Sequence, residues 1–246
     1  LTLRFYEELN DFLPPQRRKR PFEVEYRLPR SVKDLIESLN VPHVEVDLIL
    51  VNGESVSFEH PVADGDFISV YPVFEGLDIS SVNYLRPEPL RKPRFVADVH
   101  LKTLARKLRM LGFDTLYDPE LDDPALAEAA EREHRILLTR DLGLLKRGNL
   151  SRGLFLRSQH PAGQLKEVVS RLDLLAKARP LTRCIRCNEL LSTLPVQEAD
   201  PALLPEDIRL ANETVSRCDS CGRLYWRGSH YTKMLEEIRR LEETVP

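Results

Sequence analysis

Residues 95–113 read "FVADVHLKTLARKLRMLGF", and this stretch decides how the middle of the chain folds. Three apolar or small residues lead to an acid, Asp98, which predicts a short buried strand that ends on a carboxylate. Leucines such as Leu104 and Leu108 then recur at helical spacing, and Gly112 is placed to end the helix. The stretch therefore predicts a strand, an acid and a basic amphipathic helix in direct succession.

The alternation of strand and helix continues to about residue 175. Apolar runs predict further strands at residues 114–118, 135–141 and 153–158, and apolar stripes predict helices at residues 122–134 and 161–178. In the first of these helices, Asp123 suits the N-cap and Pro124 suits the first helical position. Strands that alternate with helices predict an α/β domain with a parallel sheet.

The N-terminal part of the chain has a different pattern. Residues 1–6 and 22–28 alternate apolar and polar side chains, as half-buried strands do. Residues 30–40 predict a helix with Ser31 as its N-cap, and Asn52-Gly53 predicts a tight hairpin. With one more strand after the hairpin, these elements predict a four- or five-stranded sheet wrapped on one helix.

The composition is that of a soluble globular protein. Of the 246 residues, 42% are hydrophobic and 30% are charged, and the formal net charge is −3. No apolar run approaches the roughly 18–20 residues of a membrane span, and the N-terminal residues lack the apolar core of a signal peptide. We therefore expect a cytoplasmic protein without a membrane partner. Positive charge is concentrated in residues 86–110, which contain eight Lys or Arg and two acids.

Residues 76–93 contain three prolines and little periodicity, which predicts a linker. The expected divisions are a sheet-and-helix domain at residues 1–75, the linker at 76–93, an α/β domain at 94–177, and a cysteine-bearing domain with a C-terminal helix at 178–246.

Acids follow the predicted parallel strands. Asp98 and Asp141 come directly after two of them, and Asp122 and Asp123 lie in the loop after another. Ligands of parallel sheets bind at the carboxyl ends of the strands, so these side chains are expected at one rim. Clustered carboxylates repel one another unless a cation lies between them, and Mg²⁺ and Mn²⁺ prefer oxygen ligands. One interpretation is that Asp98, Asp122 and Asp141 bind Mg²⁺ or Mn²⁺ and catalyse phosphodiester hydrolysis.

Each acid also has a structural interpretation. Asp123 is expected to serve as a helix cap, which makes Asp122 the better ligand of the two. Asp118 precedes a proline and suits a turn. Asp98 and Asp141 could each simply cap the helix that follows.

Basic residues near the acids are candidates for binding phosphate. Lys102, Arg106 and Arg109 lie three to four residues apart and could share one helix face. Arg140 directly precedes the last of the acids. Thr139 could also touch a phosphate, with a role inside its strand as the alternative.

All four cysteines lie in the last third of the chain, as the C-x-x-C pairs Cys184/Cys187 and Cys218/Cys221. A two-residue gap lets both thiolates of a tight turn reach one ion, and Zn²⁺ takes four ligands in a tetrahedron. The pairs therefore predict a structural zinc site. The adjacent segment "RLYWRGSHY" could bind single-stranded RNA through its aromatic and basic side chains. The alternative is that its Trp226 packs the cysteine domain onto its neighbour.

These blocks resemble a known family. The stretches "FVADVHLKTLARKLRMLGFDTLYD", "DDPALAEAAEREHRILLTRD", "RCIRC" and "RCDSCGRLYWRGSHYTKM" are similar, in order, to the PIN-like ribonucleases named for the C-terminal domain of the Mut-7 exonuclease. The resemblance runs from about residue 94 to the end. It implies an α/β, PIN-like three-layer domain with a parallel sheet, followed by a zinc ribbon. It also implies metal-dependent RNA cleavage by acids that fall on Asp98, the Asp122–Asp123 pair and Asp141.

The N-terminal residues resemble a second family. "VNGESV" and "VADGDFISVYPVFEG" are similar to the small ubiquitin-like sulfur carriers, and prokaryotic members of the Mut-7-related family carry ubiquitin-like domains ahead of the nuclease. This implies a β-grasp domain at residues 1–75. The carriers react through a free C-terminal Gly-Gly, whereas this chain continues past Glu75-Gly76-Leu77. The domain is therefore expected to be a binding or spacer module.

The sequence thus predicts a metal-dependent ribonuclease with structural Zn²⁺ and catalytic Mg²⁺ or Mn²⁺. Two other functions are kept as alternatives. One is an RNA-binding protein whose acids are only helix caps. The other is a docking protein whose ubiquitin-like domain recruits a protein partner.

Overall fold

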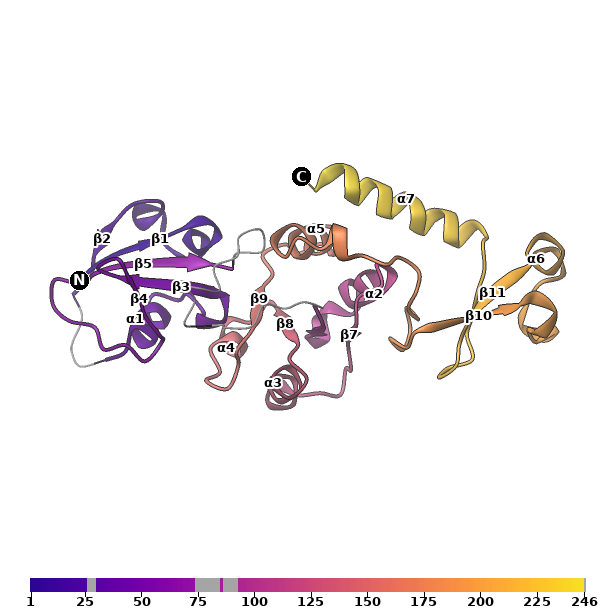
Figure 1. Ribbon diagram of the computed structural model, residues 1–246, viewed down its shortest axis with the longest axis horizontal. Coiled ribbons are helices and arrows are strands. Elements are labelled where there is room, and N and C mark those ends of the chain that lie inside the picture. Colours follow the sequence, from indigo (N-terminus) through magenta and orange to yellow (C-terminus); the bar gives the residue numbers. More distant parts are fainter. Residues whose placement is uncertain (26–29, 74–84, 86–92, 246) are drawn as a thin grey trace. The chain divides into compact units, whose positions relative to one another are not determined.

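The structure is a computed structural model that describes residues 1–25, 30–73, 85 and 93–245. The chain forms two compact units. Figure 1 labels their helices and strands. Unit 1 contains Leu1–Lys92 and Leu121–Leu156, and unit 2 contains Pro93–Glu120 and Arg157–Pro246. Apart from Leu85 and Pro93, the predicted linker lies outside the described residues.

Unit 1 begins with a five-stranded sheet in the order β2-β1-β5-β3-β4. Its strands are β1 (Thr2–Phe5), β2 (Phe22–Glu23), β3 (Val46–Val51), β4 (Glu54–Ser55) and β5 (Phe67–Pro72). The central strands β1 and β5 are parallel, and the other pairs are antiparallel. Helix α1 (Val32–Ser38) buries Leu35 and Ile36 in the core of this sheet. The arrangement is the predicted β-grasp, and we call it the β-grasp module. Three short 3₁₀ helices complete it: η1 (Glu7–Phe12), η2 (Pro15–Arg17) and η3 (His43–Glu45).

Two local sequence signals account for the shape of the β-grasp module. Ser31 caps α1 through a reciprocal capping box, in which its Oγ accepts from Asp34 N at 3.2 Å and its N–H donates to the Asp34 carboxylate at 3.3 Å. Asn52 and Gly53 have φ angles of 52° and 91°, the left-handed conformation that a tight hairpin turn requires. Both predictions are confirmed.

The second half of unit 1 contains two parallel strands with their helices. These elements are α3 (Asp123–Arg132), β8 (Ile136–Thr139), α4 (Leu142–Leu145) and β9 (Gly153–Phe155). The β-grasp module binds this half directly. Lys146 Nζ, just after α4, donates to Asn40 Oδ1 at 3.0 Å and to Glu37 O at 3.2 Å, and His43 Nε2 lies 2.9 Å from Leu150 O.

Unit 2 contains the strand and helix predicted from residues 95–113. Its first elements are β6 (Phe95–Ala97), η4 (Val99–Leu101), α2 (Lys102–Met110), β7 (Thr115–Leu116), α5 (Pro161–Arg171) and η5 (Leu175–Lys177). Strands β6 and β7 are parallel, and α2 packs against α5. Gly112 ends α2 with a φ of 90°, and a Cβ atom at this position would lie 2.1 Å from Arg179 O. Only glycine therefore fits this turn.

The rest of unit 2 carries the cysteines. Its elements are β10 (Leu191–Pro195), η6 (Val196–Glu198), η7 (Pro201–Leu203), α6 (Glu206–Ala211), β11 (Thr214–Cys218), β12 (Leu224–Tyr225) and the terminal helix α7 (Ser229–Thr244). The three strands form an antiparallel sheet in the order β10-β11-β12. We call residues 182–225 the cysteine module.

The mixed α/β class and the parallel strands are confirmed. The three-layer PIN-like arrangement and the four domain boundaries stay predictions. Within the described part of the chain, no helix is both long and apolar enough to cross a membrane.

Candidate functional site

Each of the three aspartates predicted to bind metal is the N-cap of a helix. Asp98 follows β6 in unit 2, and its Oδ1 accepts from the backbone N–H two residues later at 3.1 Å. In unit 1, Asp141 follows β8 and accepts from the N–H two residues later at 2.7 Å. Asp122 caps α3 by accepting from the N–H three residues later at 3.0 Å. A cap uses one of the roughly four lone-pair sites of a carboxylate, so it orients the group without using all its acceptors.

The prediction that Asp123 caps α3 was wrong. Asp122 holds the N-cap position, and Asp123 is the first residue of the helix. Two adjacent aspartates are equally good caps, so the local pattern could not choose between them. Asp123 is exposed, and its Oδ2 lies 3.9 Å from Arg147 Nη2. The preference for Asp122 as a metal ligand rested on Asp123 being the cap, so that reason no longer holds.

The exposed basic residues lie on both units. Lys102 and Arg106 are exposed on α2, Arg140 is exposed after β8, and none of them forms an ion pair with a described residue. Thr139 is fully buried, and its Oγ1 accepts a hydrogen bond from Asp141 N at 3.0 Å. Thr139 therefore has the structural role that was its alternative, and it fixes the turn that carries Asp141.

Arg109 differs from the other predicted phosphate ligands because it is buried, with 4% of its surface exposed. Its guanidinium donates to Thr115 O at 2.9 Å, to Ile185 O at 3.2 Å and to Arg186 O at 2.7 Å. Burial lowers the pKa of Arg109, and the nearby thiols of the first cysteine pair oppose this shift. We assign Arg109 a structural role, because its hydrogen bonds connect α2 and β7 to the first cysteine turn, which is the turn that contains Cys184 and Cys187.

Asn188 completes this attachment, and sequence analysis missed it. Its side chain accepts from Thr115 N at 2.9 Å and donates to Asp114 Oδ1 at 2.8 Å. Its φ of 74° is left-handed, which asparagine tolerates better than most residues. An asparagine directly after a C-x-x-C pair was the signal that could have identified it.

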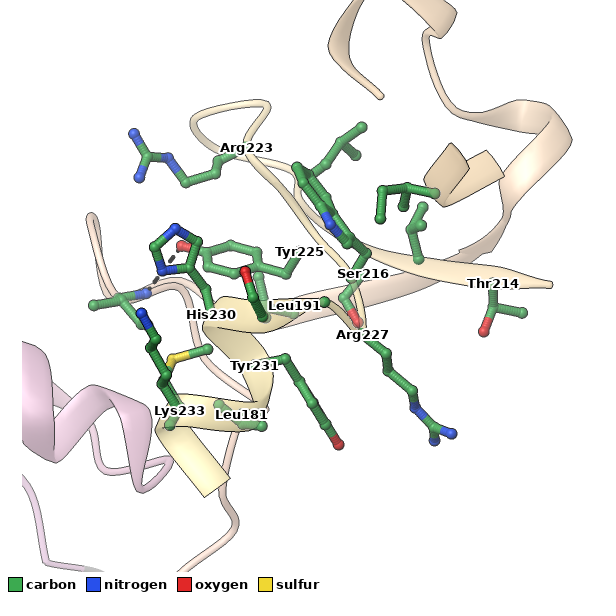
Figure 2. Close-up of a pocket in the computed structure, with 18 of the residues that line it drawn as sticks. Leu181, Leu191, Thr214, Ser216, Arg223, Tyr225, Arg227, His230, Tyr231 and Lys233 are labelled. Carbon is green, nitrogen blue, oxygen red and sulfur yellow. Dashed lines mark hydrogen bonds between the residues drawn. The ribbon is translucent and has the colours of Figure 1, made fainter. Parts of the chain in front are cut away.

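The aromatic residues beside the second cysteine pair are held in place. The Tyr225 hydroxyl accepts a hydrogen bond from Ile185 N at 3.2 Å (Figure 2). The same hydroxyl lies 3.1 Å from Cys184 Sγ. Trp226 packs against a small core that contains Leu194 and Val215. Trp226 therefore packs against the core of the cysteine module itself, and its predicted packing of that module onto a neighbour stays a prediction.

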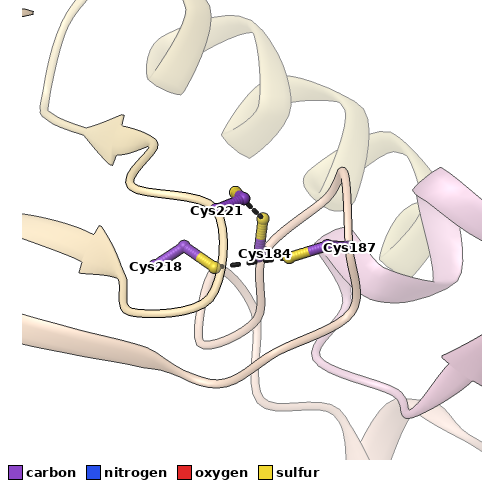
Figure 3. A group of neighbouring side chains, drawn as sticks. All are labelled: Cys184, Cys187, Cys218 and Cys221. Carbon is purple, nitrogen blue, oxygen red and sulfur yellow. Dashed lines mark hydrogen bonds between the residues drawn. The ribbon is translucent and has the colours of Figure 1, made fainter.

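The four cysteines come together as predicted (Figure 3). Their Sγ atoms all lie within 4.8 Å of one another. Cys184 and Cys221 are separated by 3.7 Å, and Cys187 and Cys218 by 3.3 Å. Zinc–sulfur bonds of about 2.3 Å in a tetrahedron place sulfurs about 3.8 Å apart, so the four thiols fit a metal ion such as Zn²⁺. No other group of three or more His, Cys, Asp or Glu ligand atoms comes this close within residues 1–25, 30–73, 85 and 93–245.

The surroundings shift the pKa values of Cys184, Cys218 and Cys221 in different directions. Burial acts to raise the pKa of Cys184, but hydrogen bonds from the Tyr225 hydroxyl and from backbone N–H groups outweigh it and lower the pKa to about 6. Burial raises the pKa of Cys218 to about 12 and also raises that of Cys221. Cys184 therefore ionises before Cys218 and Cys221.

Taken together, these features define a mixed α/β protein in which a β-grasp module precedes parallel strands followed by acids and a cluster of four cysteines that could hold a metal ion. Residues 93–238 match the family model of the Mut7-C RNAse domain, and residues 1–78 match that of the Mut7-C ubiquitin domain. The chain belongs to the Mut7-C RNAse domain family. Comparison with curated proteins and with solved structures gave no significant match.

Proposed function

We propose that the protein is a metal-dependent ribonuclease in which Asp98, Asp122 and Asp141 bind Mg²⁺ or Mn²⁺. The observation that carries the proposal is that the three carboxylates occupy the same kind of place along the chain. Each comes after a parallel strand and is held at a helix N-terminus by a backbone N–H group. The match to an RNAse-domain family supports RNA as the substrate.

The proposed ligands suit a hard cation because they offer only oxygen donors. A bound ion would polarise the scissile phosphodiester and lower the pKa of an attacking water. The caps hold the carboxylates in fixed orientations before the ion arrives. The exposed cations Lys102, Arg106 and Arg140 would bind flanking phosphates.

We propose Zn²⁺ as the ion of the cysteine module, which would then be a zinc ribbon. All four positions are sulfur, so such an ion would lack the open position that catalytic zinc requires. Its role would be to join the turn of Cys184 to the turn of Cys221.

The test compares Asp98→Asn and Asp141→Asn with the wild-type protein. Asparagine caps helices as well as aspartate does, so both variants should fold normally while losing a charged metal ligand. We expect at least about 100-fold slower cleavage of labelled RNA with Mn²⁺ or Mg²⁺, and weaker Mn²⁺ binding by calorimetry. Asp118→Asn is the matched control, because the Asp118 side chain makes one hydrogen bond with a described residue, a turn contact that its Oδ1 accepts from Glu120 N at 3.0 Å. Full activity in a folded Asp98→Asn protein would refute the mechanism.

A second candidate function is RNA binding without catalysis. It is favoured by the use of all three acids as helix caps, which is their complete role in this interpretation. Such a protein would cleave no RNA with any divalent ion and would still bind RNA with salt-dependent affinity. Recruitment of a protein partner by the β-grasp module and a cytoplasmic location also stay predictions.

A further inference from the structure

We infer that a groove between the cysteine module and the start of α7 binds single-stranded RNA through backbone phosphates and a stacked base. This inference rests on the proposed function, because it names a site that holds the substrate of the proposed nuclease. The groove lies within unit 2 and has a volume of about 1130 Å³. Sites for small molecules have volumes of roughly 300–1,000 Å³, so the groove is large enough to hold a segment of a polymer.

The charge of the groove is positive. Its cations are Arg183, Arg223, Arg227 and Lys233, and its acids are Asp207 and Glu237. Glu237 forms an ion pair with Lys107, so its charge is already offset. In contrast, Arg223, Arg227 and Lys233 are exposed and form no ion pair with a described residue. A polyanion is therefore the complementary ligand.

These cations project from two elements. In Figure 2, Arg223 and Arg227 flank the short strand β12, and His230, Tyr231 and Lys233 project from the beginning of α7. Cations distributed along a groove suit the repeating charges of a nucleic acid backbone better than a single compact anion.

The aromatic residues of the groove are not equivalent. Tyr225 is held by Ile185 N and Cys184 Sγ, and Trp226 packs into the core of the cysteine module. All three rings are half-buried, but the Tyr231 side chain on α7 forms no hydrogen bond or ring contact with a described residue, so we assign base stacking to its ring. Stacking on an aromatic ring tolerates any base, which predicts binding with little sequence preference.

The experiment measures binding separately from cleavage. The Asp98→Asn protein, loaded with zinc and without added Mg²⁺ or Mn²⁺, is titrated into a fluorescein-labelled 12-nucleotide oligouridine while anisotropy is followed across a range of salt concentrations. Groove substitutions are added to this background. Arg240→Gln is the matched control, because Arg240 is an exposed cation on the same helix α7 and does not line the groove.

Two variants should give different signatures. Tyr231→Leu should weaken binding about 5- to 150-fold without changing the salt dependence, and Tyr231→Phe should restore the affinity. Replacing both Arg227 and Lys233 with Gln should reduce the slope of log affinity against log salt by about 1.4, since each phosphate contact on a single strand contributes about 0.7. Zinc content and circular dichroism would establish that each variant is folded.

Three outcomes would overturn the inference: no binding by the Asp98→Asn protein at low salt, equal affinities of the groove variants and the Arg240→Gln control, or equal binding of duplex RNA. Comparing the affinities for RNA and for a DNA oligomer of the same sequence establishes whether the protein contacts the ribose 2′-hydroxyl. The Asp98→Asn protein could bind RNA through the groove and also cleave it fully when Mn²⁺ is added. That result would support the groove as an RNA-binding site and refute the proposed catalytic acids.

Discussion

The structural role of Arg109 leads to a quantitative prediction. Substitution of Arg109 by Met keeps an apolar stem and removes three hydrogen bonds to carbonyl oxygens of β7 and the first cysteine turn. A net contribution of about 1–1.5 kcal/mol per bond gives a loss of about 3–5 kcal/mol. The matched control is Arg106→Met, because Arg106 lies on the same helix, is exposed and forms no ion pair with a described residue. This change should cost less than about 0.5 kcal/mol.

The assay is urea unfolding at a fixed free zinc concentration, followed by the fluorescence of Trp226, which is the only tryptophan of the protein. With a slope of about 2 kcal/mol per molar urea, the loss corresponds to a midpoint lower by about 2 M for Arg109→Met. If Arg109 instead contacted phosphate, Arg109→Met would unfold with the wild-type midpoint and would bind RNA with a reduced salt slope. That result would refute the structural assignment.

Two further predictions concern the cysteine module and the turn before β7. At pH 7–8 the raised pKa values keep the thiols of Cys218 and Cys221 protonated when no metal is bound. Zinc binding must therefore release at least two protons, and zinc affinity should rise at least about 100-fold for each unit of increasing pH. Below pH 6 Cys184 is protonated as well, so zinc affinity should then change by at least about 1000-fold per pH unit. Competition with a chromophoric chelator measures the zinc affinity, and a slope below two protons at pH 7–8 would contradict the prediction. Gly112→Ala should destabilise unit 2 by about 2–4 kcal/mol, because its Cβ would overlap Arg179 O. Gly148→Ala, where nothing lies within 4 Å, should change stability by less than about 0.5 kcal/mol, and equal melting temperatures for the two variants would count against the steric explanation.

The sequence predicted features that depend on neighbouring residues. The cap at Ser31, the turn at Asn52-Gly53 and the helix end at Gly112 were found because each residue type fits a local backbone conformation. The pairing of the cysteines was also predictable, because C-x-x-C places two thiols in one turn.

Features that depend on distant residues were missed. The spacing of Lys102, Arg106 and Arg109 is the same for an exposed face as for a face covered by another part of the chain. Arg109 is covered by residues more than 70 positions later, and no local pattern contains that information. The strands of the cysteine module were missed because they are short and few of their residues are buried.

The attachment of the β-grasp module to α4 and β9 has a consequence for how the chain can be divided. Glu45 is almost completely buried, and its carboxylate accepts from Phe155 N. The ammonium group of Lys146 reaches two oxygens of the segment that ends α1. A protein trimmed to begin at residue 93 would expose these partners to water and remove the contacts that support α4, the helix that Asp141 caps. The ubiquitin-like portion is thus part of the scaffold that supports α4 and β9 in this chain.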